Sequence, residues 1–127
     1  MANNAFINSE SSNGTCTGTA PAGAPNTAWL LTSLIVSQAG PTVSANAKVT
    51  VWDGAVGGTK LFSASLGGPG IPGGIGSVGI VQDIPLPKDP YGRPNIVATP
   101  GNAMTIQVTG TGVNLVCLNA RVSDGLP

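Results

Sequence analysis

Glycine and proline interrupt this chain so often that a long helix has no room to form. The 127 residues include 19 glycines and 11 prolines. Both are unfavourable inside helices, proline by about 3 kcal/mol relative to alanine. In the short segments between them, apolar and polar residues alternate, which is typical of a β-strand with one buried face. The sequence therefore predicts many short strands joined by turns.

Residues 45–66 show this pattern most clearly. Two alternating runs flank a glycine-rich reversal that begins at Asp53. An Asp-Gly pair between alternating runs indicates a β-hairpin. In the first run, Val49 and Val51 share one face, and Trp52 lies on the other. The remaining strands are expected to pack on this hairpin.

Six further segments have the length and composition of strands. The strand at residues 78–87 contains Pro85, which favours a sheet edge because proline has no N–H to donate. In the last strand, apolar residues at every second position predict a core face, and Cys117 lies on the opposite face. The segments are residues 15–19, 28–37, 78–87, 95–98, 102–109 and 114–123. About eight short strands without a helix predict an all-β fold, an antiparallel β-sandwich resembling a jelly roll.

The chain divides by composition into two parts. Residues 1–27 are rich in small polar residues, glycine and proline, and we expect an extended N-terminal arm there and a β-sandwich domain in residues 28–127. Phe6 and Ile7 are the bulky apolar pair of the arm and are candidate contacts with a partner. Ile71 and Ile75 are two more, in the uncharged loop 67–79. That loop is either a flexible hairpin tip or an adaptable apolar surface.

Charge is scarce. Charged residues make up 8% of the chain, five basic and five acidic, against roughly a quarter in an ordinary soluble domain. The missing basic stripe argues against nucleic-acid binding. No apolar run is long enough to span a membrane, and the N-terminus lacks a secretion signal, so we expect synthesis in a cytoplasm. A neutral surface favours self-association, and we expect a homo-oligomer, preferably a trimer.

The residues for catalysis or metal binding are missing. The chain has no histidine, so neither a Ser-His-Asp nor a Cys-His arrangement is possible. Its five carboxylates fall in turns, at termini or on an open strand face, and we expect no enzyme, cofactor or metal. Cys16 and Cys117 are expected to be buried thiols, with a disulfide as the alternative. Trp29, Trp52 and Tyr91 leave a weak sugar-binding surface open, although both tryptophans are expected in the core.

Four consecutive features resemble the small structural proteins of tailed-phage virions. They are the apolar strand AWLLTSLIVS, the hairpin VTVWDGAVGGTKLF, the proline-rich return IPLPKDPYGRP and the closing strands AMTIQVTGTGVNLVCLNARV. The resemblance covers roughly residues 29–122 and is one of pattern more than identity. Head decoration proteins, also called capsid cement proteins, are the most similar.

The resemblance implies a location on the capsid surface, with the major capsid protein as partner. It implies a protein that stabilises the shell by bridging neighbouring capsid subunits, with no enzyme activity. No functional residues carry over, because such proteins act through surfaces. The alternatives are a fibre base, a tail adaptor, or a receptor- or glycan-binding module of the virion, and lastly a small enzyme.

Overall fold

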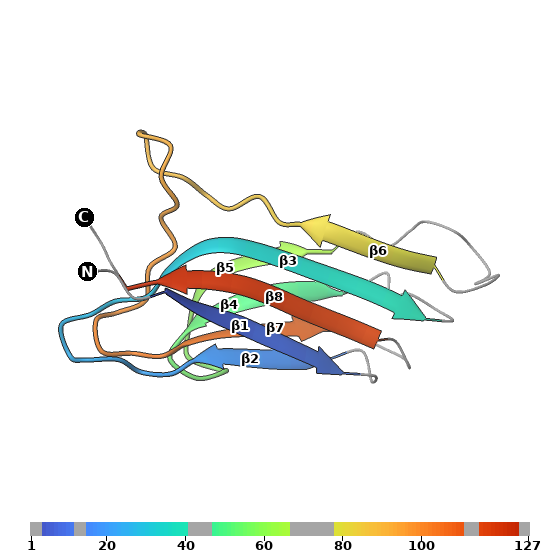
Figure 1. The fold of residues 1–127 in the computed structure, drawn as a ribbon, viewed down its shortest axis with the longest axis horizontal. Coiled ribbons are helices and arrows are strands. Elements are labelled where there is room, and N and C mark those ends of the chain that lie inside the picture. Colours follow the sequence, from blue (N-terminus) through green and yellow to red (C-terminus); the bar gives the residue numbers. More distant parts are fainter. Residues whose placement is uncertain (1–3, 12–14, 41–46, 67–77, 111–114, 125–127) are drawn as a thin grey trace.

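The protein, seen here as a computed structural model, is built of β-strands joined by turns and loops (Figure 1). The structure describes residues 4–11, 15–40, 47–66, 78–110 and 115–124. Within these ranges there is no helix, which confirms the predicted all-β class. The strands are β1 Asn4–Ser11, β2 Cys16–Ala20, β3 Leu30–Gly40, β4 Lys48–Asp53, β5 Thr59–Ser65, β6 Val78–Asp83, β7 Met104–Thr109 and β8 Leu115–Ser123.

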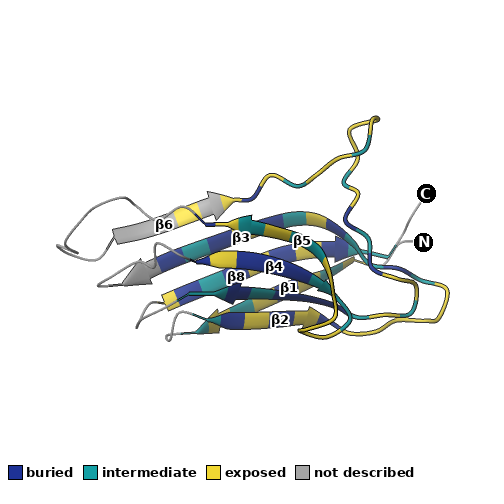
Figure 2. Cartoon of the chain, turned by 180° about the vertical axis from the view of Figure 1, so that it is seen from behind, coloured by how far each residue is buried: buried dark blue, intermediate teal, exposed yellow. Residues whose placement is uncertain are grey.

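The strands form two antiparallel sheets of four, which Figures 1 and 2 show from opposite sides. Sheet A has the order β1-β8-β3-β6, and sheet B has the order β2-β7-β4-β5. Thus β1 pairs with β8, β2 with β7, β3 with β6 and β4 with β5. The four pairs alternate between the two sheets along the chain, which is the strand order of an eight-stranded jelly roll. The predicted antiparallel β-sandwich is confirmed.

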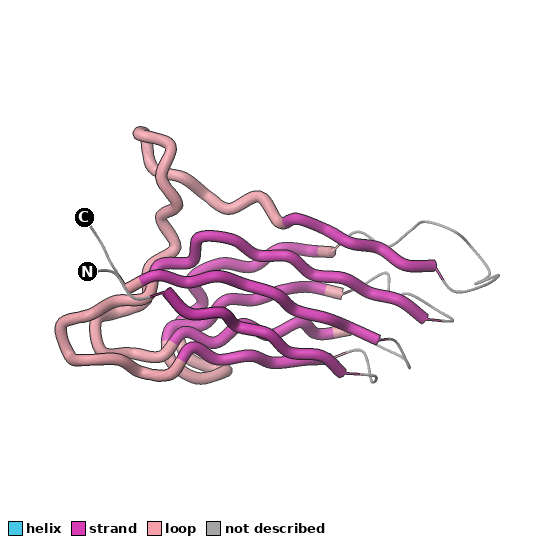
Figure 3. Tube along the Cα trace, viewed as in Figure 1, coloured by secondary structure: helices cyan, strands magenta, loops and turns pink. Residues whose placement is uncertain are grey.

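The connection from β6 to β7 departs in part from the expectation. As expected, β6 is an edge strand, but it ends at Asp83, before Pro85, and not at residue 87 as predicted. The predicted strand at 95–98 is instead part of the loop (Figure 3). It lies along the start of β3, where the Leu31 amide donates to the Ile96 carbonyl at 3.0 Å. Prolines at positions 94 and 100 flank this stretch and remove the amides that would extend a ladder.

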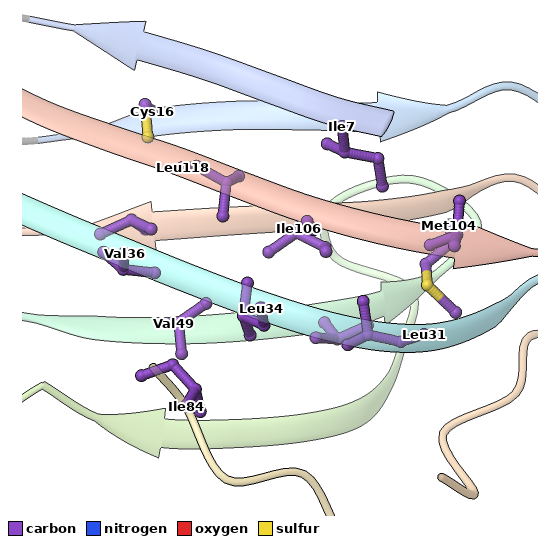
Figure 4. Close-up of a cluster of buried hydrophobic side chains, with 14 of the residues drawn as sticks. Ile7, Cys16, Leu31, Leu34, Val36, Val49, Ile84, Met104, Ile106 and Leu118 are labelled. Carbon is purple, nitrogen blue, oxygen red and sulfur yellow. The ribbon is translucent and has the colours of Figure 1, made fainter. Parts of the chain in front are cut away.

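The core lies between the sheets, where every second residue of the central strands points inward. Ile7, Leu31, Leu34 and Val36 from sheet A face Val49, Val51, Met104, Ile106 and Val108 from sheet B (Figure 4). In β8 the predicted core residues Val116, Leu118, Ala120 and Val122 are all buried, and Cys117 lies on the other face. Burying a side chain of this size stabilises the fold by about 1.5–3 kcal/mol, so this alternation fixes which face of each strand is internal.

The prediction of an N-terminal arm in residues 1–27 is wrong. β1 is a strand of sheet A and β2 a strand of sheet B, so the sandwich begins at residue 4 and not at 28. Ile7 is only 2% exposed and belongs to the core. The inward face of β1 also includes Ser9, and that of β2 includes Gly18. Small and polar residues at inward positions hide the alternation, which is why the segment reads as an arm.

A candidate binding face on sheet A

Apolar side chains gather on the outer face of sheet A, the face turned away from sheet B. Phe6 of β1 is 65% exposed and Val81 of β6 is 74% exposed, and Ile35 of β3 and Leu115 of β8 are exposed as well. These are four of the six large apolar side chains exposed among the described residues. All four strands contribute one, so the exposed apolar side chains are spread over the whole face.

The strand register brings polar residues between these apolar ones. Phe6 is opposite Arg121, and the guanidinium lies 5.3 Å from the centroid of the Phe6 ring. Asn8 is opposite Asn119, which in turn is opposite Ile35. In the next row, Glu10, Cys117, Ser37 and Val81 lie side by side on β1, β8, β3 and β6.

Three neighbouring hollows that share lining residues lie along this face, and together we call them the trough. A hollow of about 370 Å³ is lined by Asn8, Ser9, Glu10, Cys117 and Asn119. It shares Asn8 and Asn119 with a hollow of about 160 Å³ beside Phe6 and Arg121. That hollow shares Ser33 with a third of about 440 Å³, which runs past Thr32 and Asp83 to Lys88 and Pro94. A trough of this kind admits a side chain or an extended ligand.

The polar groups in the trough are open to a partner. The side-chain amides of Asn8 and Asn119 make no hydrogen bond within the described part of the chain. Glu10 accepts a long contact of 3.9 Å from the Cys117 thiol. Two carboxylates, Glu10 and Asp83, and one guanidinium, Arg121, give the face a net charge of −1. The face is thus apolar, weakly acidic and rich in free hydrogen-bonding groups.

The predicted contact residues lie in different places in the structure. Phe6 lies on this face, but Ile7 is buried on the other side of β1, so its predicted role as a partner contact is wrong. Neighbouring residues of a strand point to opposite faces, so only one of the pair can be exposed. Ile71 and Ile75 lie outside the described residues. The sequence analysis does not name Ile35, Val81 or Leu115 as contact residues. What distinguishes each of them in the sequence is an apolar side chain at a strand position that alternates with the core positions.

The aromatic residues considered for sugar binding come from three separate regions. Trp29, half-buried before β3, donates from Nε1 to the Pro21 carbonyl at 2.9 Å. Trp52, half-buried on the outer face of sheet B, has the Lys60 ammonium 5.5 Å from its ring centroid. Trp29 is partly buried and packs against the core, whereas Trp52 does not belong to it, so the expectation that both lie in the core is correct only for Trp29. Tyr91 lies in the loop after β6 and is 83% exposed.

Asp53 and Cys16 are titratable groups with structural roles. Asp53 accepts hydrogen bonds from the Thr99 amide at 3.1 Å and from Asn102 Nδ2 at 3.0 Å, and also from the Thr99 hydroxyl. The Thr99 hydroxyl is the main reason that the pKa of Asp53 lies below its usual value. Cys16 and Cys117 are both free thiols. Burial, aided by the nearby Cys117, raises the pKa of Cys16 to about 11.

The described residues contain no cluster of three or more histidine, cysteine, aspartate or glutamate side chains able to hold a metal ion. A search of the same residues for an apolar helix long enough to cross a membrane finds none.

Comparison with known proteins gives no family for this chain. No family model and no curated protein matches it. The structure is similar to the K3 cleaved adhesin domain of Lys-gingipain from Porphyromonas gingivalis w83, with a TM-score of 0.44 and 11% identity. That match covers 87% of this chain but only 64% of the adhesin chain, less than two thirds of its length.

A second similarity is to the virus-like particle of the extra small virus of the giant freshwater prawn Macrobrachium rosenbergii. Its TM-score is 0.27 at 16% identity, over 100% of this chain and 80% of the viral chain. Both similarities are too weak to bear on function.

Proposed function

We propose that this protein is a structural component of a phage particle that binds the outside of the capsid and bridges neighbouring capsid subunits. The observation that carries the proposal is the outer face of sheet A, with Phe6, Ile35, Val81 and Leu115 exposed on its four strands. Exposed apolar side chains on all four strands of one sheet face make this face the candidate for a partner contact. The polar residues between them suit an interface that forms after each partner has folded.

The outer face of sheet A is smaller than a typical stable interface. Four strands about 4.8 Å apart, each presenting roughly seven residues at 3.3 Å, cover roughly 400 Å². A stable interface usually takes roughly 800 Å² from each partner. One such contact is therefore weak by itself. A copy that touches several capsid subunits gains affinity from their combined contacts, and binding only to the assembled lattice stabilises that lattice by mass action.

Location is the first test. Particles purified from the source of this chain are imaged by cryo-electron microscopy, and many copies over the head are expected. A few copies at the tail instead favour a fibre base or tail adaptor. Absence of the protein from purified particles contradicts every virion role.

The contact surface is tested on particles stripped of the protein. Val81→Asp and Phe6→Asp, each placing a charge on the outer face of sheet A, should lower occupancy by about tenfold or more. The matched control is Val56→Asp, which changes an exposed valine in the turn between β4 and β5. If all three variants decorate heads like the unmodified protein, the outer face of sheet A is not the contact.

The trough also supports the glycan-binding alternative, because Asn8 and Asn119 offer free amides beside the exposed ring of Phe6. Amide and hydroxyl groups next to an aromatic ring suit a hydroxyl-rich ligand. A glycan array with the full-length protein tests this function. Specific binding that Asn119→Ala abolishes would favour the alternative over shell binding.

A further inference from the structure

The loop between β6 and β7 contains a narrow finger, residues 87–95, that projects beyond both sheets (Figure 1, Figure 3). Its two sides are held together by backbone hydrogen bonds. The Asn95 amide donates to the Pro87 carbonyl at 3.2 Å, and the Asp89 amide donates to the Arg93 carbonyl at 2.8 Å. A bridge between Lys88 and Pro94 lies between them.

The Asp89 side chain fixes the tip of the finger. Its carboxylate accepts hydrogen bonds from the Tyr91 amide at 2.8 Å, the Arg93 amide at 3.0 Å and Arg93 Nε at 3.1 Å. Gly92 supplies the left-handed turn, with φ of 79°, which costs glycine little. The tip therefore holds its shape before it meets a partner, and pre-organisation lowers the entropy cost of binding.

The side chains displayed by this tip suit protein recognition. Tyr91 is 83% exposed, and the Arg93 guanidinium lies 5.5 Å from its ring centroid. Tyrosine and arginine are among the residues most often found at the energetic centre of interfaces. Two cations, Lys88 and Arg93, against one carboxylate, Asp89, give the tip a net charge of +1. A partner for this tip needs a concave, acidic site.

The same chain carries such a site at the β1–β8 side of the trough. It is the hollow of about 370 Å³ lined by Asn8, Ser9, Glu10, Cys117 and Asn119. Among these lining residues, Glu10 is the one that carries a charge. Its carboxylate is exposed, and within the described part of the chain the hydrogen-bond donor to it is the weak thiol of Cys117. The free amides of Asn8 and Asn119 add hydrogen-bonding groups beside it. We name this site the Glu10 hollow.

We propose that the finger of one copy docks into the Glu10 hollow of a second copy. Arg93 uses one of its five N–H donors on Asp89, so the four on its terminal nitrogens remain for a carboxylate such as Glu10. The Tyr91 ring fills the hollow beside the asparagine amides. Arg121, the cation on this face, lies over the Phe6 ring and is four residues from Cys117 along β8, roughly 13 Å at 3.3 Å per residue, so it does not occupy the Glu10 carboxylate.

The finger and the Glu10 hollow of one chain lie far apart. In Figure 1 the finger stands above the left end of the sheets, while β1 ends and β8 begins at the lower right. A finger therefore cannot reach the hollow of its own chain. Each copy offers one finger and one hollow, so the contact can be made twice in a two-fold dimer, or it can repeat head to tail and close into a ring where the rotation between copies permits. This inference does not depend on the capsid role.

The test measures self-association of the full-length protein by sedimentation velocity over a range of concentrations at low salt. Concentration-dependent oligomers are expected. Tyr91→Ser should raise the dissociation constant by about tenfold or more, because Asp89 bonds the backbone of residue 91 and the turn survives. Arg93→Glu and Glu10→Arg should each have a similar effect, and the double variant Arg93→Glu/Glu10→Arg should restore association.

Lys48→Glu, a charge reversal on sheet B, is the matched control and should associate like the unmodified protein. A strictly monomeric protein at all concentrations overturns the inference. So does association that Tyr91→Ser and Glu10→Arg leave intact, and so does a double variant no better than the single ones. Decoration of capsids by a monomeric protein would refute this contact and leave the proposed function standing.

Discussion

Phe6 and Arg121 lie opposite each other on neighbouring strands, with the guanidinium 5.3 Å from the aromatic ring. The pairing joins the first strand of the fold to the last. It also fixes the orientation of β1, because placing Phe6 beside Arg121 on the outer face turns Ile7 into the core. Two consecutive apolar residues thus have separate roles, Ile7 in stability and Phe6 in surface chemistry.

Truncating each of these two residues should separate the roles. Ile7→Ala removes a fully buried side chain and should lower the free energy of unfolding by about 2–5 kcal/mol. Phe6→Ala, the matched control, changes an exposed side chain and should lower it by about 0.5 kcal/mol or less. Urea denaturation measures both. Equal losses for the two variants would contradict the assignment of Ile7 to the core.

Deletion of residues 1–11 should prevent stable folding. Without β1, the edge of β8 loses its hydrogen-bonding partner and the core loses Ile7. Circular dichroism and thermal melting of the truncated chain measure the effect. A cooperative melting transition at the full-length temperature would instead support a detachable arm.

Gly18 should tolerate no side chain while Ile7 is present. Gly18 is buried in β2, and a methyl group added there would collide with Cγ2 of Ile7 across the sandwich. Gly18→Ala should therefore destabilise the fold by about 1–3 kcal/mol. Because the two sites touch, their effects should not add. The double variant Gly18→Ala/Ile7→Ala, in which Cγ2 of residue 7 is absent, should destabilise the fold by less than the sum of the two single changes, and strict additivity would argue against this contact.

Stability should depend on pH through Asp53. Hydrogen bonds from Thr99 and Asn102 lower the pKa of this carboxylate below its ordinary value of 3.8. Its stabilising effect is therefore complete above pH 3.8 and is lost as the pH falls through the lower value of the folded state. Asp53→Asn should cost about 1 kcal/mol at pH 7 and less at pH 2. Urea melts of both proteins at these two pH values measure the difference, and a cost that does not change with pH would refute this role.

The two thiols should differ in reactivity at pH 8. Cys16 is buried, with its pKa raised to about 11, so very little of the reactive thiolate form is present. Cys117 lines the Glu10 hollow and is partly exposed. A thiol reagent followed by mass spectrometry should modify one cysteine in the native protein and two after denaturation. Cys117→Ser should leave no fast-reacting thiol, and rapid labelling of Cys16 in that variant would show that β2 is not packed as described.

The sequence alone determined the strand content and most of the core faces. Alternation is a local property, so Val49 and Val51 in β4 and the apolar positions of β8 identify their own buried side wherever the strand lies. Pro85 likewise places its strand at a sheet edge without knowledge of the neighbouring strands, although the strand ends at Asp83 and not at residue 87. The sequence also marks Phe6 as a candidate contact, because it is a bulky apolar residue in a polar segment.

Only the tertiary structure decided that β1 and β2 belong to the sandwich. Their inward faces carry Ser9, Gly18 and other small residues, which give no hydrophobic signal and become buried because β8 and β7 pair with them. The binding face, too, exists only through register, since Ile35, Val81 and Leu115 stand far apart in the chain. Pairing between distant strands, which no local pattern encodes, places these side chains on one surface and the Glu10 hollow at the opposite corner from the finger.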